Sequence, residues 1–446
     1  MPVLTRLDHK ILGIAWPAIL SNLSIPLLGL VDAAILGHLG STDYLAAVAI
    51  GSAILSFLYW GFGFLRMGTT GLVAKAAGAG KEADSIVILS QSVVLALLLA
   101  ALVMALHPLW LGLGFSLMAP QDQLLPLAQS YAGIRILSAP AVLTTYAIVG
   151  WFIGHQNTRW PMVIVITTNI ANIGLDFLLI MGLGMASDGA AIATVIAEYL
   201  GLLIGMFAIA RSAKVMPSRV QFQILLSLRA YRTLLASNVN LFIRTLCLLA
   251  SFAFFTAMGD KLGSSTLAAN ALLLHLMMLA AYGLDGFAFA AEGLTGNALG
   301  ARSLSTFYAA VHRCARWCAI TAAAISIVFA LSTELLFPLL TDLPAVRSEM
   351  IAVSFWLILL PVIAAPSYLL DGVFIGSAET RPMMITMLLS TLAVYLPVWY
   401  LTQSWGNHGL WFAFTAFNGA RGLTLWVAYR HKTRAGSWLQ IANARV

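Results

Sequence analysis

The stretch that decides the fold is Tyr146-Ala-Ile-Val-Gly-Trp-Phe-Ile-Gly-His-Gln-Asn-Thr-Arg159, because it recurs as Tyr368-Leu-Leu-Asp-Gly-Val-Phe-Ile-Gly-Ser-Ala-Glu-Thr-Arg381. The second copy lies 222 residues after the first, and seven of the fourteen positions are identical. The same shift relates further short matches, namely Gly71-Leu72 to Gly293-Leu294 and Leu45-Ala46-Ala47 to Leu267-Ala268-Ala269. Separated matches at one shift, about half the chain length, indicate a duplicated half.

The composition indicates that the chain lies in a membrane. Of its 446 residues, 61% are hydrophobic and 9% are charged, whereas a soluble globular protein usually carries about 25% charged residues. Long apolar runs such as 86–106 suit helices that cross a bilayer, and they lack the alternation of a β-barrel strand. The sequence therefore predicts an all-α integral membrane protein. Duplication in such a chain is typical of a transporter with two lobes.

The apolar runs predict twelve transmembrane helices, six in each half. An even number per half gives both halves the same orientation, so a pseudo-two-fold axis along the membrane normal should relate the lobes. We expect an N-terminal lobe over 1–211, a linker over 212–228, a C-terminal lobe over 229–429 and a tail over 430–446. The expected spans are 11–36, 45–72, 85–113, 124–154, 160–182, 188–211, 229–258, 266–298, 306–336, 346–376, 383–403 and 408–429.

The distribution of lysine and arginine predicts the orientation, because these residues concentrate in cytoplasmic loops. One side of the membrane collects nearly all of them, including the linker and the tail, whereas the other side has Lys261 and Arg347. Both termini and the linker are therefore expected in the cytoplasm. The net charge of +7 reflects this asymmetry. Because the basic residues are spread over many loops, we expect no nucleic-acid partner.

Asp32 is the first of the ionisable residues that the expected spans contain. Charged side chains at bilayer depth are costly and usually functional. Pro26 removes a backbone donor and Gly29 weakens the helix, so a hinge is expected close to this carboxylate. A carboxylate beside a bendable segment is what a proton-driven switch needs. The alternative is a structural hydrogen bond to a neighbouring helix.

Polar residues also form stripes on the fifth and sixth spans. Asn172 and Asp176 are four residues apart and share one helix face, which Asn169 joins. Thr194 and Glu198 share a face of the sixth span in the same way. Polar contacts between helices are common in membranes and explain the asparagine and threonine residues without a functional role. Such contacts explain the acidic residues less well, although Glu198 would also suit a pairing with an arginine.

The second half carries a different set of acids. Asp285 and Glu292 are seven residues apart on the eighth span, and Asp371 lies in the tenth. These carboxylates would suit a cation or a cationic substrate in the second lobe. Equally, they would pair with basic residues, of which the candidates are Arg244, Arg313 and Arg316. Arg66 and Arg135 are the other arginines expected at membrane depth.

Several of these motifs resemble the multidrug and toxic compound extrusion (MATE) transporters. The resemblance covers the whole chain and is carried by paired motifs: Pro26 with Val31-Asp32 and Gly37-His-Leu-Gly40, Gly71–Ala79 with its copy Gly293–Ala301, and the turns Gly154–Arg159 and Gly376–Arg381. Three further stretches look like the bacterial branch of DNA-damage-inducible protein F: Phe64–Gly71, Ala190–Tyr199 and Leu284–Ala288.

The resemblance implies a multi-pass protein of the bacterial inner membrane that exports cationic or amphipathic drugs in exchange for H⁺ or Na⁺. In proton-coupled members a first-helix aspartate takes the proton, and it matches Asp32. Its partners match Asn172, Asp176 and Thr194, so these four residues are the expected coupling site. The family often has a tyrosine one turn before the acid, where this chain has Leu28. We expect a monomer that needs no cofactor besides the coupling ion.

Three alternatives to a proton-coupled drug exporter follow from the same residues. The oxygens of Asp32, Asn172, Asp176 and Thr194 would also suit Na⁺. A lipid flippase of related architecture would need a strongly basic cavity, whereas only Arg66, Arg135 and Arg244 are expected at membrane depth, against six acidic residues. An enzyme is not expected, because the chain lacks His-Glu-x-x-His, Gly-x-Ser-x-Gly and a phosphate-binding loop.

Overall fold

The structure is a computed structural model that describes residues 5–39, 41–213, 225 and 227–439. Within these residues all regular secondary structure is helical, which confirms the expected all-α class. Most of the expected linker, 212–228, and the end of the expected tail, 440–446, lie outside the described residues.

The helices of the first half are α1 (Arg6–Gly37), α2 (Thr42–Gly61), α3 (Phe64–Gly78), α4 (Glu82–Ala105), α5 (His107–Met118), α6 (Leu125–Arg135), α7 (Ala139–Gly154), α8 (Arg159–Asp176) and α9 (Ala186–Ser212).

In the second half, α12, α13 and α14 are longer than any helix described in the first half, whereas α15 and α16 are short. Short 3₁₀ or π-helical turns join or extend several helices, and two of them, η2 (Phe177–Gly182) and η4 (Ser390–Tyr395), are π-helical. The helices are α11 (Arg232–Lys261), α12 (Ser264–Gly300), α13 (Leu304–Leu340), α14 (Pro344–Gly376), α15 (Thr380–Leu389), α16 (Leu396–Thr402) and α17 (Asn407–Arg434).

Eleven helical segments among the described residues are long and apolar enough to cross a membrane. The twelfth expected span, 408–429, is present as α17, which is less apolar than the other eleven. Its aromatic residues Trp411, Phe414 and Phe417 are buried in the protein, and so are its polar residues Asn418 and Arg421. A helix surrounded by protein carries polar groups at lower cost than a helix that faces lipid.

Prolines interrupt two of the expected spans. The span expected at 85–113 stops at Ala105, and α5 starts again at His107 with Pro108 in its first turn. The span expected at 124–154 contains a 3₁₀ turn, η1 (Ile136–Ser138), just before Pro140 of α7. Proline has no backbone N–H and clashes with the preceding turn, so it is favoured where a helix begins. The second of these breaks places Arg135 at the end of α6.

The duplication is visible in the backbone geometry of the turns. After α7, Gln156 adopts a left-handed conformation with φ 59°, and after α14 the equivalent Ala378 has φ 50°. The backbone N–H of Asn157 donates to the carbonyl oxygen of Phe152 at 2.9 Å. The backbone N–H of the equivalent Glu379 donates to the carbonyl oxygen of Phe374, also at 2.9 Å. The 222-residue shift therefore relates structures as well as residue types.

The chain divides into two compact units. One comprises Met1–Ile19, Ala74–Gly80 and Ala236–Val446, and the other comprises Leu20–Val73 and Lys81–Leu235. These units cut across the expected lobe boundaries at the start of α1 and the end of α3. The reason is close packing within the first unit, since a side chain on Gly286 would overlap Ile19 and one on Gly300 would overlap Lys75.

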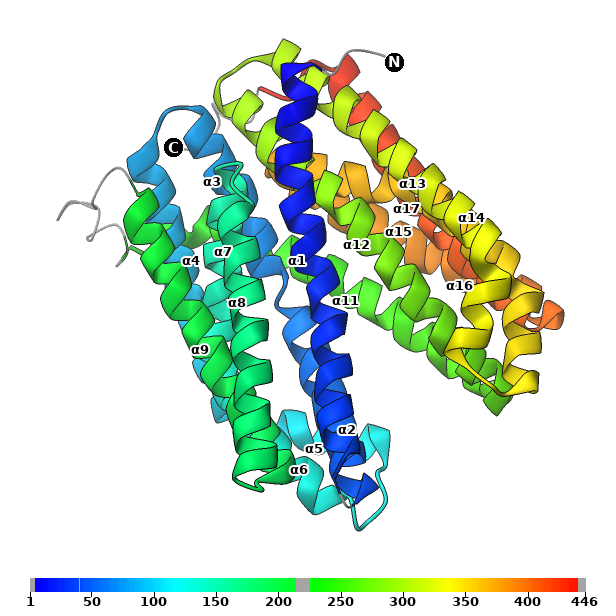
Figure 1. Cartoon of the computed structure of the whole chain (residues 1–446). Coiled ribbons are helices and arrows are strands. Elements are labelled where there is room, and N and C mark those ends of the chain that lie inside the picture. The colour runs from blue at the N-terminus through cyan, green and yellow to red at the C-terminus, as the bar shows by residue number, and fades with distance from the viewer. Residues whose placement is uncertain (1–4, 40, 214–224, 226, 440–446) are drawn as a thin grey trace. The chain divides into compact units, whose positions relative to one another are not determined.

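Each unit has its own core. In the first unit α14 packs against α12, α13 and α17 (Figure 1), and an aromatic cluster around Phe255, Trp411 and Phe414 fills the space beside them. In the second unit α8 packs on α9, α4 on α7, and α6 on α2 and α9 (Figure 1).

Candidate functional site

Three helices of the second unit bring the expected coupling residues together. Asp32 lies on α1, Asn172 and Asp176 on α8, and Thr194 on α9. Asn172 and Asp176 are each only 1% exposed, because α8 and α9 pack along this face. The structure thus gathers all four residues that the sequence indicated. Their neighbours on α1 and α8 are mostly apolar, which makes this a polar site in a low-dielectric setting.

Asn172 bridges the two helices. In the orientation that satisfies both ends of its amide, the nitrogen donates to Asp176 Oδ2 at 2.9 Å. The amide oxygen then accepts from Thr194 Oγ1 at 3.0 Å and from the Thr194 backbone N–H at 3.2 Å. The network of partners decides the orientation of such an amide. Asn172 therefore ties the carboxyl group of Asp176 on α8 to the backbone of α9.

The carboxyl groups of Asp32 and Asp176 lie close enough to share a hydrogen bond. An ionised carboxylate only accepts hydrogen bonds, so a bond between two carboxyl groups requires a proton on one of them. Two ionised carboxylates close enough to share a hydrogen bond would repel each other strongly in a low dielectric. The arrangement can therefore hold one proton between α1 and α8.

A second link joins α8 to α1 near the expected hinge. Asn169 donates from its amide to the Ser24 backbone oxygen at 3.2 Å and to Ser24 Oγ at 3.0 Å. Pro26 follows two residues later, and its missing N–H leaves the Asn22 carbonyl without the usual helical donor. The helix α1 nevertheless runs without a break from Arg6 to Gly37. Gly29 is exposed, and a side chain there would meet no other atom within 4 Å.

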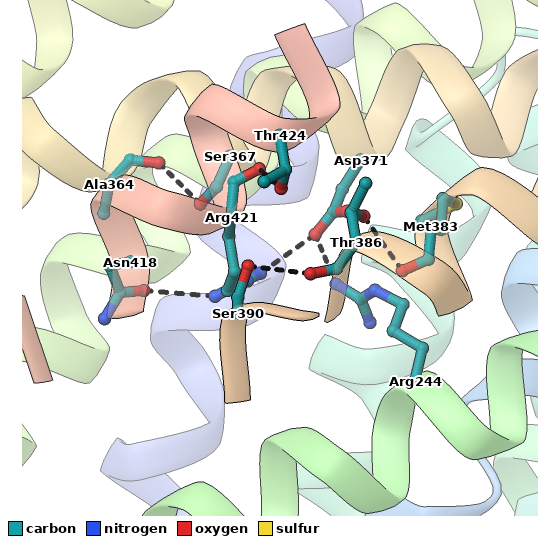
Figure 2. Close-up of polar contacts among 10 residues, drawn as sticks. All are labelled: Arg244, Ala364, Ser367, Asp371, Met383, Thr386, Ser390, Asn418, Arg421 and Thr424. Atoms are coloured by element: carbon teal, nitrogen blue, oxygen red, sulfur yellow. Dashed lines mark hydrogen bonds and ion pairs between the residues drawn. The ribbon is translucent and has the colours of Figure 1, made fainter. Parts of the chain in front are cut away.

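The second expected group of residues lies in the first unit, where Asp371 is held by two arginines. Figure 2 shows the Asp371 side chain of α14 between Arg244 of α11 and Arg421 of α17. Arg244 donates to Asp371 Oδ2, and Arg421 donates to the same oxygen at 3.0 Å. Arg421 also donates to Asn418 Oδ1 at 3.1 Å. All four side chains are buried.

Asp285 and Glu292 both lie on α12, which packs against α14, the helix that carries Asp371. Asp285 is half-buried on α12 and interacts electrostatically with Tyr282, Tyr368 and Cys318. Tyr368 also interacts electrostatically with Asp371. Glu292 is buried on the same helix.

Of the three arginines considered as partners for these acids, Arg244 pairs with Asp371. Arg313 instead pairs with Asp8 at 3.4 Å, near the start of α1. Asp8 also accepts a hydrogen bond from the Trp317 indole at 3.0 Å, so α13 holds the first turn of α1.

Sequence reasoning did not single out Arg421, Asn418 or Ser24. Arg421 could have been identified from the sequence, because it is a charged residue inside the span expected at 408–429. For Asn418 and Ser24 no such signal exists, since small polar residues are common in membrane helices and their partners lie far away in the chain.

Comparisons with known proteins agree with this architecture. Residues 17–178 and 241–401 match the MatE family, once in each repeat. DNA damage-inducible protein F of Escherichia coli is 39% identical over 98% of this chain and 95% of its own length. Protein DETOXIFICATION 44, chloroplastic, of Arabidopsis thaliana is 26% identical over 99% of this chain and 86% of its own length.

Solved structures have the same fold. The crystal structure of the Vibrio cholerae MATE transporter VcmN in the bent form has a TM-score of 0.85 at 22% identity, and covers 96% of this chain and 97% of that chain. The match extends over both repeats and therefore includes all the helices that carry the polar clusters. The chain is a multi-pass membrane protein and belongs to the MATE family of multidrug and toxic compound efflux transporters.

Proposed function

We propose that this transporter exports cationic or amphipathic organic compounds in exchange for H⁺, through protonation of Asp32 and bending of α1. It acts in a bacterial inner membrane with both termini in the cytoplasm, as the loop charges predict. The observation that carries the proposal is the close approach of the Asp32 and Asp176 carboxyl groups, which face each other between α1 and α8. A carboxyl pair that shares one proton is suited to coupling proton uptake to a rearrangement of the helices that carry it.

The coupling step follows from the contacts of the pair. When a proton reaches Asp32, the bond to Asp176 forms and draws α1 toward α8. When the proton leaves, the two carboxylates repel each other, and Asn172 remains as the donor to Asp176. The link from Asn169 to Ser24 lies next to Pro26, so movement at the pair is transmitted to the part of α1 that bends most easily. A related transporter has been crystallised in a bent form.

The energy available is of the right order for such a switch. One charge that crosses a potential of 100 mV contributes about 2.3 kcal/mol. A tenfold difference in proton concentration contributes about 1.4 kcal/mol. Together these exceed the free energy of a typical single hydrogen bond, which is about 0.5–1.5 kcal/mol. One proton per cycle is therefore enough to break and re-form the contacts of Asp32.

The test is export of a fluorescent organic cation from proteoliposomes. With an imposed pH gradient the wild-type protein should transport the dye, and Asp32→Asn should abolish the response to the gradient. Asp122→Asn, a change of an exposed loop carboxylate, is the matched control and should transport normally. Full pH-driven export by Asp32→Asn would rule out the proposed role of this residue.

Sodium is the second candidate for the coupling ion, because Asp32, Asn172, Asp176 and Thr194 together offer several oxygen ligands. The same proteoliposomes distinguish the two ions. Export driven by a sodium gradient without a pH gradient would favour Na⁺. Export driven only by a pH gradient would favour H⁺. Movement of a labelled lipid between the leaflets, without dye export, would instead indicate a flippase.

For the second repeat we propose a structural role for the ion cluster. Asp371 shares one oxygen between Arg244 and Arg421, so its negative charge is already balanced by two cations. A further cation near it would face the repulsion of both guanidinium groups. The cluster joins α11, α14 and α17, and Asn418 extends it along α17. It is thus better suited to holding the second repeat together than to binding a cationic drug.

A further inference from the structure

The last turns of α17 are held against the rest of the first unit by the segment that follows them. Trp438 lies just beyond the end of the helix and is only 4% exposed. Its ring centre lies 4.9 Å from that of Phe307 on α13 and 5.8 Å from that of Phe374 on α14. It lies 5.5 Å from the ring centre of Tyr429 on α17 itself. The side of α17 that carries Tyr429 therefore faces the protein.

Lys432 lies on the same side of the helix and is held in the same way. Its Nζ atom lies 3.3 Å from Glu379 Oε2 and 5.7 Å from the centre of the Trp438 ring. The Trp438 indole N–H donates to Thr433 Oγ1 at 3.0 Å. These contacts fix the rotation of the end of α17, and so they decide which of its residues face outward.

The opposite side of this helix end is exposed. Residues spaced three or four apart share one face of a helix, and here they form an outer stripe that consists of Leu423, Trp426, Val427, Arg430, His431 and Arg434. The three apolar members are 60%, 44% and 55% exposed, in chain order. The three basic members are exposed as well. An open groove of about 490 Å³ follows the stripe and is lined by Trp426, Val427, Arg430, His431, Arg434 and Ala435.

The outer stripe changes from apolar to basic where α17 leaves the bilayer. The helix has 28 residues, so it is about 42 Å long, whereas the hydrocarbon core of a bilayer is about 30 Å thick. Its last turns thus reach the headgroup region, on the side that the loop charges predict to be cytoplasmic, where tryptophan is enriched. The Arg430 guanidinium lies 4.7 Å from the centre of the Trp426 ring. The stripe therefore offers an apolar surface to acyl chains and cations to headgroups.

The basic members of the stripe have charges that the protein does not balance. Within the part of the chain that the structure describes, no carboxylate forms an ion pair with Arg430, His431 or Arg434. Lys432, on the inner side of the same turns, does have such a partner. Arg430 and Arg434 are four residues apart, so their guanidinium groups reach the same region above the helix. Guanidinium groups match phosphate oxygens in both charge and geometry.

We propose that the outer stripe of α17 binds an anionic phospholipid. Its phosphate lies between Arg430 and Arg434, and its acyl chains lie along Trp426 and Val427. Basic pockets beside membrane helices suit such headgroups. A second copy of the chain would fit this face less well, because two sets of arginines would then repel each other. The inference goes beyond the proposed function and does not depend on the ion that drives export.

The experiment measures the melting temperature of the full-length protein in a neutral detergent as lipid is added. Phosphatidylglycerol should raise the melting temperature, and phosphatidylcholine with the same acyl chains should raise it less. Inorganic phosphate at the same concentration should leave it unchanged, because it lacks the chains that lie along Trp426. The response to phosphatidylglycerol should weaken as salt is added, since exposed charges are screened.

Paired arginine variants test the site itself. The double variant Arg430→Gln, Arg434→Gln should need about tenfold more phosphatidylglycerol, or more, for a half-maximal rise. The matched control is Arg159→Gln, Arg232→Gln, which removes two exposed arginines elsewhere and should respond like the wild type. If both double variants respond alike, or if the two lipids stabilise the wild type equally, the proposal is overturned. Equal stabilisation by inorganic phosphate would show a free-anion site and would also overturn it.

Two further variants keep the test decisive should the double glutamine variant fail to fold. Arg430→Lys, Arg434→Lys keeps both charges and should keep most of the response. Trp426→Leu removes the ring beneath Arg430 and should weaken the response about two- to fivefold. An unchanged response of Trp426→Leu, together with loss of the response in the lysine variant, would contradict the arrangement. Since the readout is lipid binding, failure of pH-driven export would leave this inference standing, and failure here would leave the proposed function standing.

Discussion

Gly78 at the end of α3 lies directly against the backbone of Asn297 on α12, so that a Cβ on this glycine would overlap the Asn297 carbonyl oxygen. The repeat makes the same contact in reverse, because Gly300 lies against the carbonyl oxygen of Lys75. Residues 75 and 78 become 297 and 300 under the 222-residue shift. Ala74 and Gly296, which are also equivalent, touch each other between these two contacts. The local pseudo-two-fold axis therefore passes through this crossing of α3 and α12.

The crossing predicts that Gly78→Ala and Gly300→Ala destabilise the protein. Each added methyl group would meet backbone atoms, which move only together with a helix. Overpacking of this kind typically costs about 1–3 kcal/mol. The melting temperature of the purified protein in detergent should fall for each single variant. The double variant should fall less than the sum of the two, because one separation of the helices relieves both overlaps.

Gly13→Ala is the matched control for this pair. Gly13 lies on an exposed face of α1, and a side chain there would meet nothing within 4 Å. Alanine is favoured over glycine inside a helix by about 1 kcal/mol. The control should therefore melt at or above the wild-type temperature. If Gly78→Ala behaves like Gly13→Ala, the close crossing of α3 and α12 is wrong.

The crossing shows what the duplication could predict and what it could not. The shift of 222 residues identified equivalent glycines and equivalent turns, such as those at Gln156 and Ala378, because both copies keep the same residue types. It could not predict that the two copies of the glycine segment touch each other. Two equivalent segments are expected to have the same local structure, but their contact depends on packing in three dimensions. For the same reason the sequence did not predict that Ala74–Gly80 packs with the second repeat.

The ion cluster of the second repeat predicts a ranking among its variants. Asp371→Asn leaves two buried guanidinium groups without their carboxylate, and breaking a buried pair in this way costs about 3–5 kcal/mol. Arg421→Gln should cost less, because Arg244 remains paired with Asp371. Melting temperatures should therefore decrease in the order wild type, Arg421→Gln, Asp371→Asn. The pH profile of any Asp371→Asn protein that folds should match the wild-type profile.

Asp122→Asn again serves as the control for loss of a carboxylate, since this residue is exposed. One outcome would contradict the structural role of Asp371. If Asp371→Asn melts like the wild-type protein and weakens binding of a cationic dye, the carboxylate is a ligand site and the proposed structural role is wrong.

The two polar clusters differ in how far the sequence could predict them. Asn172 and Asp176 lie four residues apart, so helical periodicity alone placed them on one face, and the structure finds them bonded through the amide. Asp371 and Arg421 lie 50 residues apart on different helices, and no periodicity relates them. The local stripe was therefore predictable, whereas the long-range pair needed the packing of α14 against α17.

The last prediction concerns the bridge from Asp176 through Asn172 to Thr194. Asn172→Leu removes the amide that donates to Asp176 and leaves a buried carboxyl group without this partner. A hydrogen bond to a charged group contributes about 1.5–3 kcal/mol, so pH-driven export should slow about tenfold or more. Thr194→Val removes one hydroxyl but keeps the bond between Asn172 and Asp176, so it should slow export less. Thr194→Ser keeps the hydroxyl and is the control. Initial rates of dye export, compared at equal amounts of folded protein, check this order, and a Thr194→Val protein slower than Asn172→Leu would contradict it.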